Sequence, residues 1–312
     1  MNGTIQFENR LLGQMSLGRM AWVSLAFVLQ NLPLVLLVAV VFFVPLDLLC
    51  GWLASNVLRV DSRLNLRSLL VIVPFIGSFQ INLLGYSAIA WAVGEAIEGR
   101  APSIVAAIGR FSTRRMLQIF ATLIYEVWLI FWPILAMLCI NGLAFAVLMS
   151  SVPLPRALGF AGVIFVVILD ICFLAISIIN GIDYCFAEFP AIFEGTFVRR
   201  AASRSKKLVN GRRLWIFVAI NLVCVPLVVV SLSVTVGLPS VMGWPPEDFT
   251  SMAGVFRAAC FSLINAILVA NGIVFQTLLY FRLRREKHDL TFFDLSNTSI
   301  LPPASEAAGI SR

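Results

Sequence analysis

The sequence predicts an all-α integral membrane protein with six transmembrane helices. We expect three parallel two-helix repeats, with amphipathic interfacial helices between them. Of the 312 residues, 60% are hydrophobic and only 12% are charged, whereas a soluble domain carries about 25% charged residues. The mean hydropathy is +0.95, and landmark residues recur along the chain at a nearly constant period. This composition excludes a soluble enzyme, a disordered chain and a disulfide-stabilised scaffold.

Six apolar runs account for the predicted spans, because about 20 consecutive apolar residues cross the hydrocarbon core. These runs are 22–46, 68–93, 116–149, 157–187, 214–238 and 255–281. The third and fourth runs are longer than a bilayer requires, which indicates that they tilt or project beyond it. We do not interpret the N-terminal segment as a signal peptide, because its apolar run begins late and no small-residue cleavage site follows.

The basic residues predict the orientation of these spans. Eighteen of the 23 Lys and Arg residues fall on one side of the predicted membrane. They lie in the N-terminal segment, the 94–115 loop, the 188–213 loop and the C-terminal tail. Loops rich in Lys and Arg remain in the cytoplasm. We therefore expect a multi-pass membrane protein with both termini in the cytoplasm.

Several residues recur at a period of 96 to 98 positions. Arg19, Arg115 and Arg213 each precede an odd-numbered span. Near the ends of the even-numbered spans, an amide recurs four residues before a tyrosine. The pairs are Asn82 and Tyr86, Asn180 and Tyr184, and Gln276 and Tyr280. The repeat predicts three hairpins of the same orientation, related by a pseudo-threefold axis along the membrane normal.

The repeat divides the chain into five segments. These are a cytoplasmic N-terminal segment (1–21), hairpin repeats over 22–93, 94–187 and 188–285, and a cytoplasmic tail (286–312) with a disordered end. The second and third repeats begin with segments in which apolar residues at helical spacing alternate with cations, over 101–113 and 192–210. We expect helices lying in the membrane interface there. Plain basic loops are the alternative.

Two basic motifs carry a family resemblance. They read SKKLVNGRRLWIF at 205–217 and YFRLRREKHDL at 280–290. Both resemble the membrane-domain family that is fused to some bacterial glycerophosphoryl diester phosphodiesterases and also occurs alone as uncharacterised six-span proteins. The resemblance covers about residues 5–290 and implies a bacterial inner-membrane location. It does not imply the phosphodiesterase activity, since that catalytic domain is a soluble barrel with paired His, and this chain has only His288.

The sequence contains no motif of a catalytic or metal site. It has no P-loop, GxGxxG, HExxH or nucleophile elbow, and its six Cys residues form no CxxC pair. We therefore predict no catalytic residue, no metal ligand and no cofactor. These features favour a non-enzymatic protein but leave the question of enzymatic activity open.

Two acids lie deep within predicted spans. Glu126 and Asp170 fall about 15 Å and about 20 Å along the third and fourth spans, near the membrane midplane. A charge there costs about 2.5–3.5 kcal/mol. Because consecutive spans usually pack together, we expect that the two acids can meet and share a proton. The alternative is hydrogen bonding between helices by neutral acids.

The repeated polar residues form a second candidate site. If the repeat holds, the three amides lie at one depth and can ring a polar cavity. The set consists of Asn82, Asn180 and Gln276 with Tyr86, Tyr184 and Tyr280. Simple hydrogen bonding between packed helices is again the alternative.

The 188–213 loop supplies the candidates for contact with anionic lipid. They are Arg199, Arg200, Arg204, Lys206, Lys207, Arg212 and Arg213. Their position beside apolar spans argues against nucleic acid as the partner. The leading hypothesis is a non-enzymatic module that binds anionic lipid or a membrane protein partner. The alternative is a proton- or ion-coupled transporter or channel that uses Glu126 and Asp170.

Overall fold

The described part of the chain is all-helical. The computed structural model describes residues 15–57, 83–102, 113–149, 156–234 and 251–287. Five helices in these ranges are long and apolar enough to cross a membrane. Their candidate spans are Leu32–Leu49, Arg114–Ala146, Gly162–Tyr184, Arg213–Leu232 and Met252–Glu286. The predicted span 68–93 lies largely outside the described residues, and its described part belongs to the helix Leu83–Ile97.

The first predicted span, 22–46, is wrong as a single helix. α1 (Leu17–Gln30) ends at Asn31, whose backbone N–H and side-chain amide both donate to the Phe27 carbonyl. Proline follows in the first turn of α2 (Leu32–Val38), where its missing N–H costs no helical hydrogen bond. The π-helix η2 (Ala39–Phe43) and α3 (Val44–Val57) continue from α2. The candidate span is therefore Leu32–Leu49, and α1 is a separate helix.

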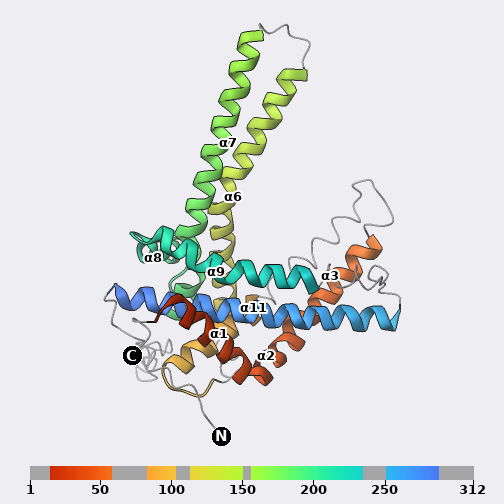
Figure 1. Ribbon diagram of the computed structural model, residues 1–312, viewed down its shortest axis with the longest axis vertical. Helices are drawn as coiled ribbons and strands as arrows, with labels where there is room; N and C mark the ends of the chain where they lie inside the picture. The colour runs from red at the N-terminus through yellow and green to blue at the C-terminus, as the bar shows by residue number, and fades with distance from the viewer. Residues whose placement is uncertain (1–14, 58–82, 103–112, 150–155, 235–250, 288–312) are drawn as a thin grey trace, which may run out of the picture.

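α11 (Met252–Glu286) is the long central helix of the fold (Figure 1). α1 packs beside its C-terminal half, where Arg282 donates to the Met15 carbonyl at 2.6 Å. α3 packs beside its N-terminal half, where Ser262 donates to Asp47 at 2.6 Å. α9 (Arg213–Leu232) covers another side of α11. Of the five candidate spans, the one in α11 is the most buried, because 44% of its apolar stretch lies inside the fold.

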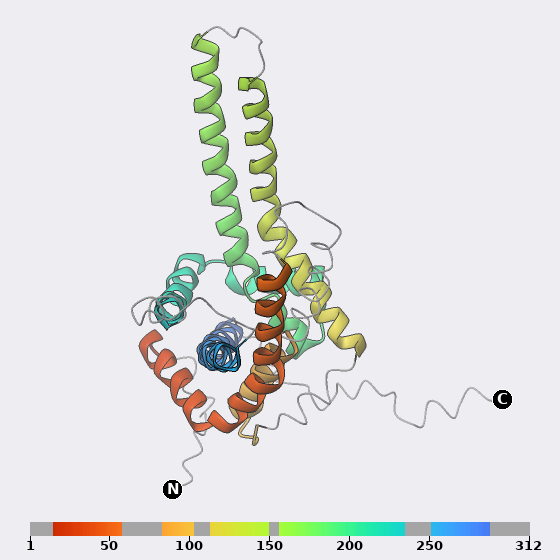
Figure 2. The same ribbon diagram turned by 90° about the vertical axis from the view of Figure 1, so that its right-hand side faces the viewer.

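α6 (Thr113–Met149) and α7 (Arg156–Tyr184) form a long hairpin. Side chains of α7 lock its register, since Ser177 donates to the Ile130 carbonyl at 2.6 Å and Asn180 to the Leu129 carbonyl at 2.8 Å. The hairpin stands away from the other helices and crosses α11 instead of running alongside it (Figures 1 and 2). The parallel arrangement of equivalent hairpins that the repeat predicts is therefore not seen among the described helices.

The chain re-enters the core between α7 and α8 (Arg199–Val209). This segment contains the π-helix η3 (Pro190–Glu194), and Phe186, Phe189 and Phe193 are buried within it. Phe189 and Phe193 both stack on Tyr280 of α11, with ring centroids 5.3 and 5.9 Å away. Each such pair contributes about 0.5–1.5 kcal/mol beyond the area it buries.

The interfacial helix that we predict over 192–210 is thus shorter than expected. Its helical part is α8, and Phe193, expected at the membrane interface, lies in the core. A left-handed Gly195, with φ of 65°, ends η3 before the chain turns into α8. The other predicted interfacial segment, 101–113, lies almost entirely outside the described residues.

Candidate functional site

α8 has one buried face and one basic face. Its buried residues are Ala201, Ala202, Ser205, Leu208 and Val209. Its exposed residues include Arg199, Arg200, Ser203, Lys206 and Lys207. Ser205 fixes the buried face, because its hydroxyl donates to the Asp183 carbonyl at 2.8 Å and accepts from the Phe186 N–H at 3.3 Å. The cations of α8 are therefore presented outward on a rigid support.

An open pocket of about 620 Å³ lies against α8. We call it the basic pocket, and its lining residues are Glu194, Thr196, Arg199, Arg200, Ser203, Arg204 and Lys207. Four of these residues are cations and one is an acid. The Glu194 carboxylate accepts hydrogen bonds from the Tyr280 hydroxyl at 2.6 Å and from Arg204 at 3.2 Å. The pocket therefore has an excess of positive charge, with guanidinium groups that suit phosphate or carboxylate.

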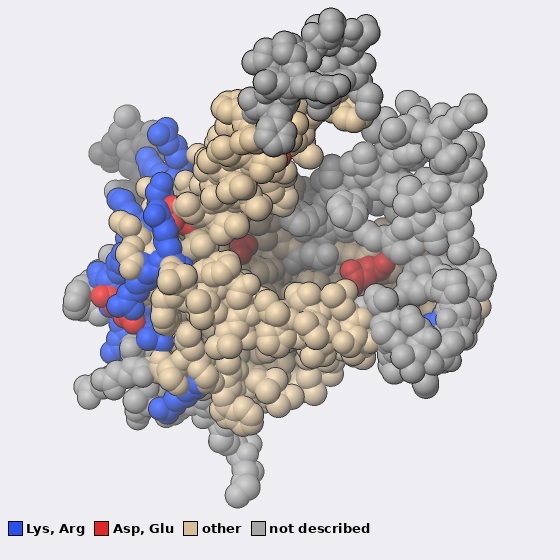
Figure 3. Space-filling model, turned by 45° about the horizontal axis from the view of Figure 1, so that its top comes forward, with Lys and Arg blue, Asp and Glu red and all other residues tan. Residues whose placement is uncertain are grey.

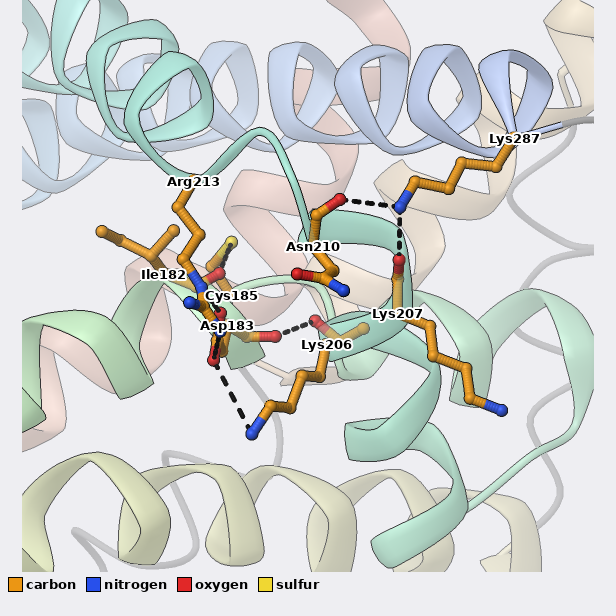
Figure 4. A network of polar contacts seen from close by, with 9 residues as sticks. Ile182, Asp183, Cys185, Lys206, Lys207, Asn210, Arg213 and Lys287 are labelled. Atoms are coloured by element: carbon orange, nitrogen blue, oxygen red, sulfur yellow. Dashed lines mark hydrogen bonds and ion pairs between the residues drawn. The ribbon is translucent and has the colours of Figure 1, made fainter.

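The end of α7 anchors two of the predicted lipid-contact residues (Figure 4). Asp183 is only 2% exposed, and Arg213 donates to both of its carboxylate oxygens, at 2.6 and 2.8 Å. Lys206 lies 4.0 Å from the same carboxylate. The neighbouring Arg212 pairs with Glu286. These three cations thus serve internal ion pairs, and the pocket uses the other four predicted residues.

Lys287 closes the C-terminal end of α8. Its ammonium donates to the Lys207 and Asn210 carbonyls, at 2.7 and 2.8 Å (Figure 4). Free carbonyls at a helix C-terminus attract cations in this way. The last residues of α11 therefore hold the helix that lines the basic pocket.

Lys and Arg gather on one side of the molecule, around α8 and the C-terminal end of α11 (Figure 3). α6 and α9 begin on this side, and α7 and α11 end there. Most of the remaining surface that the same view shows of the described residues is uncharged. The basic pocket therefore opens where several apolar helices begin or end.

The expected pairing of Glu126 with Asp170 does not form. Asp170 accepts a hydrogen bond from the Asn141 side chain at 2.8 Å. Asn141 lies 15 residues beyond Glu126 on α6, which is about 22 Å along a helix. The hairpin register that Ser177 and Asn180 set therefore keeps the two acids apart.

The repeated amides and tyrosines do not ring one cavity in the described structure. Tyr86 and Gln276 do meet, with the tyrosine hydroxyl 3.2 Å from the amide oxygen. Asn180 is used instead by the α6–α7 hairpin, and Tyr280 donates to Glu194. Tyr184 is half-buried in the last turn of α7, and Asn82 lies outside the described residues.

The sequence reasoning missed the acids of the re-entrant segment. Glu188 is 9% exposed and accepts a 2.6 Å hydrogen bond from the Tyr86 hydroxyl. Burial raises the pKa of the Glu188 carboxyl to about 7, against the hydrogen bond from Tyr86, which lowers it. One sequence signal was available, because Phe186, Phe189 and Phe193 are interleaved with Glu188 and Glu194. So many aromatic residues in a loop predict burial of the acids among them.

The described residues contain no group of three or more His, Cys, Asp or Glu placed to hold a metal ion. Comparison of the chain with protein-family models, curated proteins and solved structures finds no match. The family resemblance of the two basic motifs therefore stays a prediction from the sequence.

Proposed function

We propose that this protein is a membrane module that binds the phosphate of an anionic phospholipid headgroup in the basic pocket. The observation that carries the proposal is the pocket itself, in which four cations surround one internally satisfied acid. Its position supports a lipid ligand, because apolar helices begin and end beside it and acyl chains can lie along them. Cations near a membrane surface each contribute about 1 kcal/mol to the attraction of anionic lipid.

The proposal includes a topology. The chain crosses the membrane through its long apolar helices, and both termini lie in the cytoplasm of a bacterial cell, on the side of the basic pocket. Five helices of spanning length support the membrane crossings. The concentration of cations at one end supports the orientation. Labelling of a cysteine substituted for Lys207 in spheroplasts tests the orientation, because a membrane-impermeant reagent applied from outside should fail to reach it.

Lipid binding is tested with two double variants that remove the same charge. Arg199→Gln with Arg200→Gln removes two pocket cations, at a cost of about 2 kcal/mol, or about 30-fold in affinity for phosphatidylglycerol. Arg19→Gln with Arg114→Gln removes two exposed cations outside the pocket and should leave the affinity nearly unchanged. Native mass spectrometry of the protein released from nanodiscs gives the bound lipid.

Two outcomes would contradict the proposal. Equal losses in both double variants would mean that lipid responds to overall charge and not to the pocket. Binding of phosphatidylglycerol that survives the pocket variant would exclude the pocket as its site. A competition experiment with inorganic phosphate distinguishes a lipid from a soluble ligand. Loss of bound lipid at millimolar phosphate would identify a soluble phosphate compound, and not a lipid, as the ligand.

A further inference from the structure

A second polar cluster lies inside the fold, away from the basic pocket. Glu126 of α6 and Glu188 of the re-entrant segment are 8% and 9% exposed. Tyr86 reaches this cluster from the helix Leu83–Ile97, and Gln276 reaches it from α11. Four elements that are distant in sequence thus deliver their polar side chains to one buried place. We call Glu126 and Glu188 the buried acid pair.

The hydrogen bonds around Tyr86 show to which acceptor its hydroxyl proton points. A tyrosine hydroxyl has a single proton to donate, and the 2.6 Å contact with Glu188 is shorter than the 3.2 Å contact with Gln276. The proton therefore points to Glu188. Gln276 presents its amide oxygen to the same hydroxyl at the longer distance of 3.2 Å. The hydrogen bond that Tyr86 donates stabilises Glu188 as a carboxylate.

Glu126 is the unpartnered member of the pair. Its buried Oε2 atom has no hydrogen-bond partner, although Glu126 interacts electrostatically with Tyr86 and Cys185 and feels the charge of Glu188. A buried carboxyl oxygen without a partner is costly unless it carries or exchanges a proton.

No described cation neutralises the pair. The titratable groups that face Glu188 are Tyr86, Glu126 and Cys185, and the polar neighbour is Gln276. The nearby arginines are committed to other acids, since Arg204 and Arg284 pair with Glu194 and Arg213 pairs with Asp183. Two like charges in a buried site disfavour joint ionisation, so such a pair retains a proton.

We propose that the buried acid pair is a proton-binding site, at which Glu188 reversibly takes up a proton beside Glu126. The carboxylate of Glu188 combines with a proton from solvent to give the neutral acid, and no other bond changes. Tyr86 stabilises the ionised form of Glu188, and ionisation of both acids of the pair at once is disfavoured. The site is independent of lipid binding, because neither acid lines the basic pocket.

Infrared difference spectroscopy of the protein in nanodiscs tests this site. In the wild type, the carbonyl band of a protonated, buried carboxylic acid should disappear as the pH rises through neutrality. Glu188→Gln should remove that component, whereas Asp170→Asn, which changes an acid of the hairpin bonded to Asn141, should retain it. Tyr86→Phe should keep the component and move its midpoint upward by about one pH unit, through loss of a hydrogen bond to the ionised form.

The variants separate the possible results. A titrating component that persists in Glu188→Gln would overturn the proposal. Circular dichroism and size-exclusion chromatography show whether this variant folds. If it does not fold, Tyr86→Phe decides the question, because an unchanged midpoint would also overturn the proposal.

Discussion

The buried carboxyl of Glu188 makes the stability of the fold depend on pH. Its pKa is raised from 4.5 to about 7 by burial, and each pKa unit corresponds to about 1.4 kcal/mol. The free energy of unfolding should therefore fall by about 3 kcal/mol as the pH rises from below 4.5 to above 7. The sign follows from proton binding, because the folded state holds this proton over a pH range in which the unfolded state has released it.

Glu188→Gln removes this dependence, since the amide stays neutral at every pH. The variant should resemble the wild type near pH 4.5 and exceed its free energy of unfolding by up to about 3 kcal/mol above pH 7. Denaturant titration in mixed micelles, followed by tryptophan fluorescence at each pH, measures the difference. Ionisable groups that do not interact with Glu188 cancel in that comparison because both proteins contain them. A difference that is constant with pH, or a variant that is less stable above pH 7, would refute the reasoning.

Three further substitutions test contacts that stabilise the fold. Arg213→Gln leaves the buried Asp183 carboxylate without its bidentate partner and should lower the free energy of unfolding, measured by denaturant titration. Asn141→Ala removes the hydrogen bond to Asp170 and should cost about 0.6–2 kcal/mol in the same assay. Gly195→Ala forces a side chain into a left-handed conformation at the end of η3. It should lower the free energy of unfolding by about 1 kcal/mol, which a lower thermal midpoint would show.

Matched controls accompany these variants. Arg19→Gln removes an exposed arginine and should change the free energy of unfolding by less than about 0.5 kcal/mol. Gly18→Ala lies within α1 with open space around it, so it should be neutral or stabilising. A loss in Arg19→Gln as large as that in Arg213→Gln would contradict the role assigned to the Asp183 ion pair. The same holds for Gly195→Ala if it behaves like Gly18→Ala.

The sequence predicted the long helices well and their interruptions poorly. The apolar runs around α6, α7 and α11 are as long as a membrane-spanning helix requires. Their helical character therefore follows from composition. The break at Asn31 depends on two local residues, an amide that caps the helix end and a proline that begins the next helix. Hydropathy averaged over a span does not detect it, because both sides of the break are apolar.

Pairings of polar residues were the least predictable feature. Glu126 was identified because a charge in an apolar run is costly, and it is indeed buried. Its neighbour Glu188 was not identified, because the prediction for the 188–213 segment rests on its cations. Asp170 was assigned to the wrong partner, since the sequence does not define how far α7 slides along α6.

The sequence by itself determined the all-helical class, the apolar helices and the clustering of cations in a few segments. These properties are sums over local residues, and each residue contributes its hydrophobicity or charge wherever the chain goes. Only the tertiary structure decided which cations line the basic pocket and which are held by Asp183 and Glu286. It also decided that Tyr86, Glu126, Glu188 and Gln276 lie together. Those choices depend on helix register and on how a re-entrant segment packs, which are set by contacts between residues far apart in the chain.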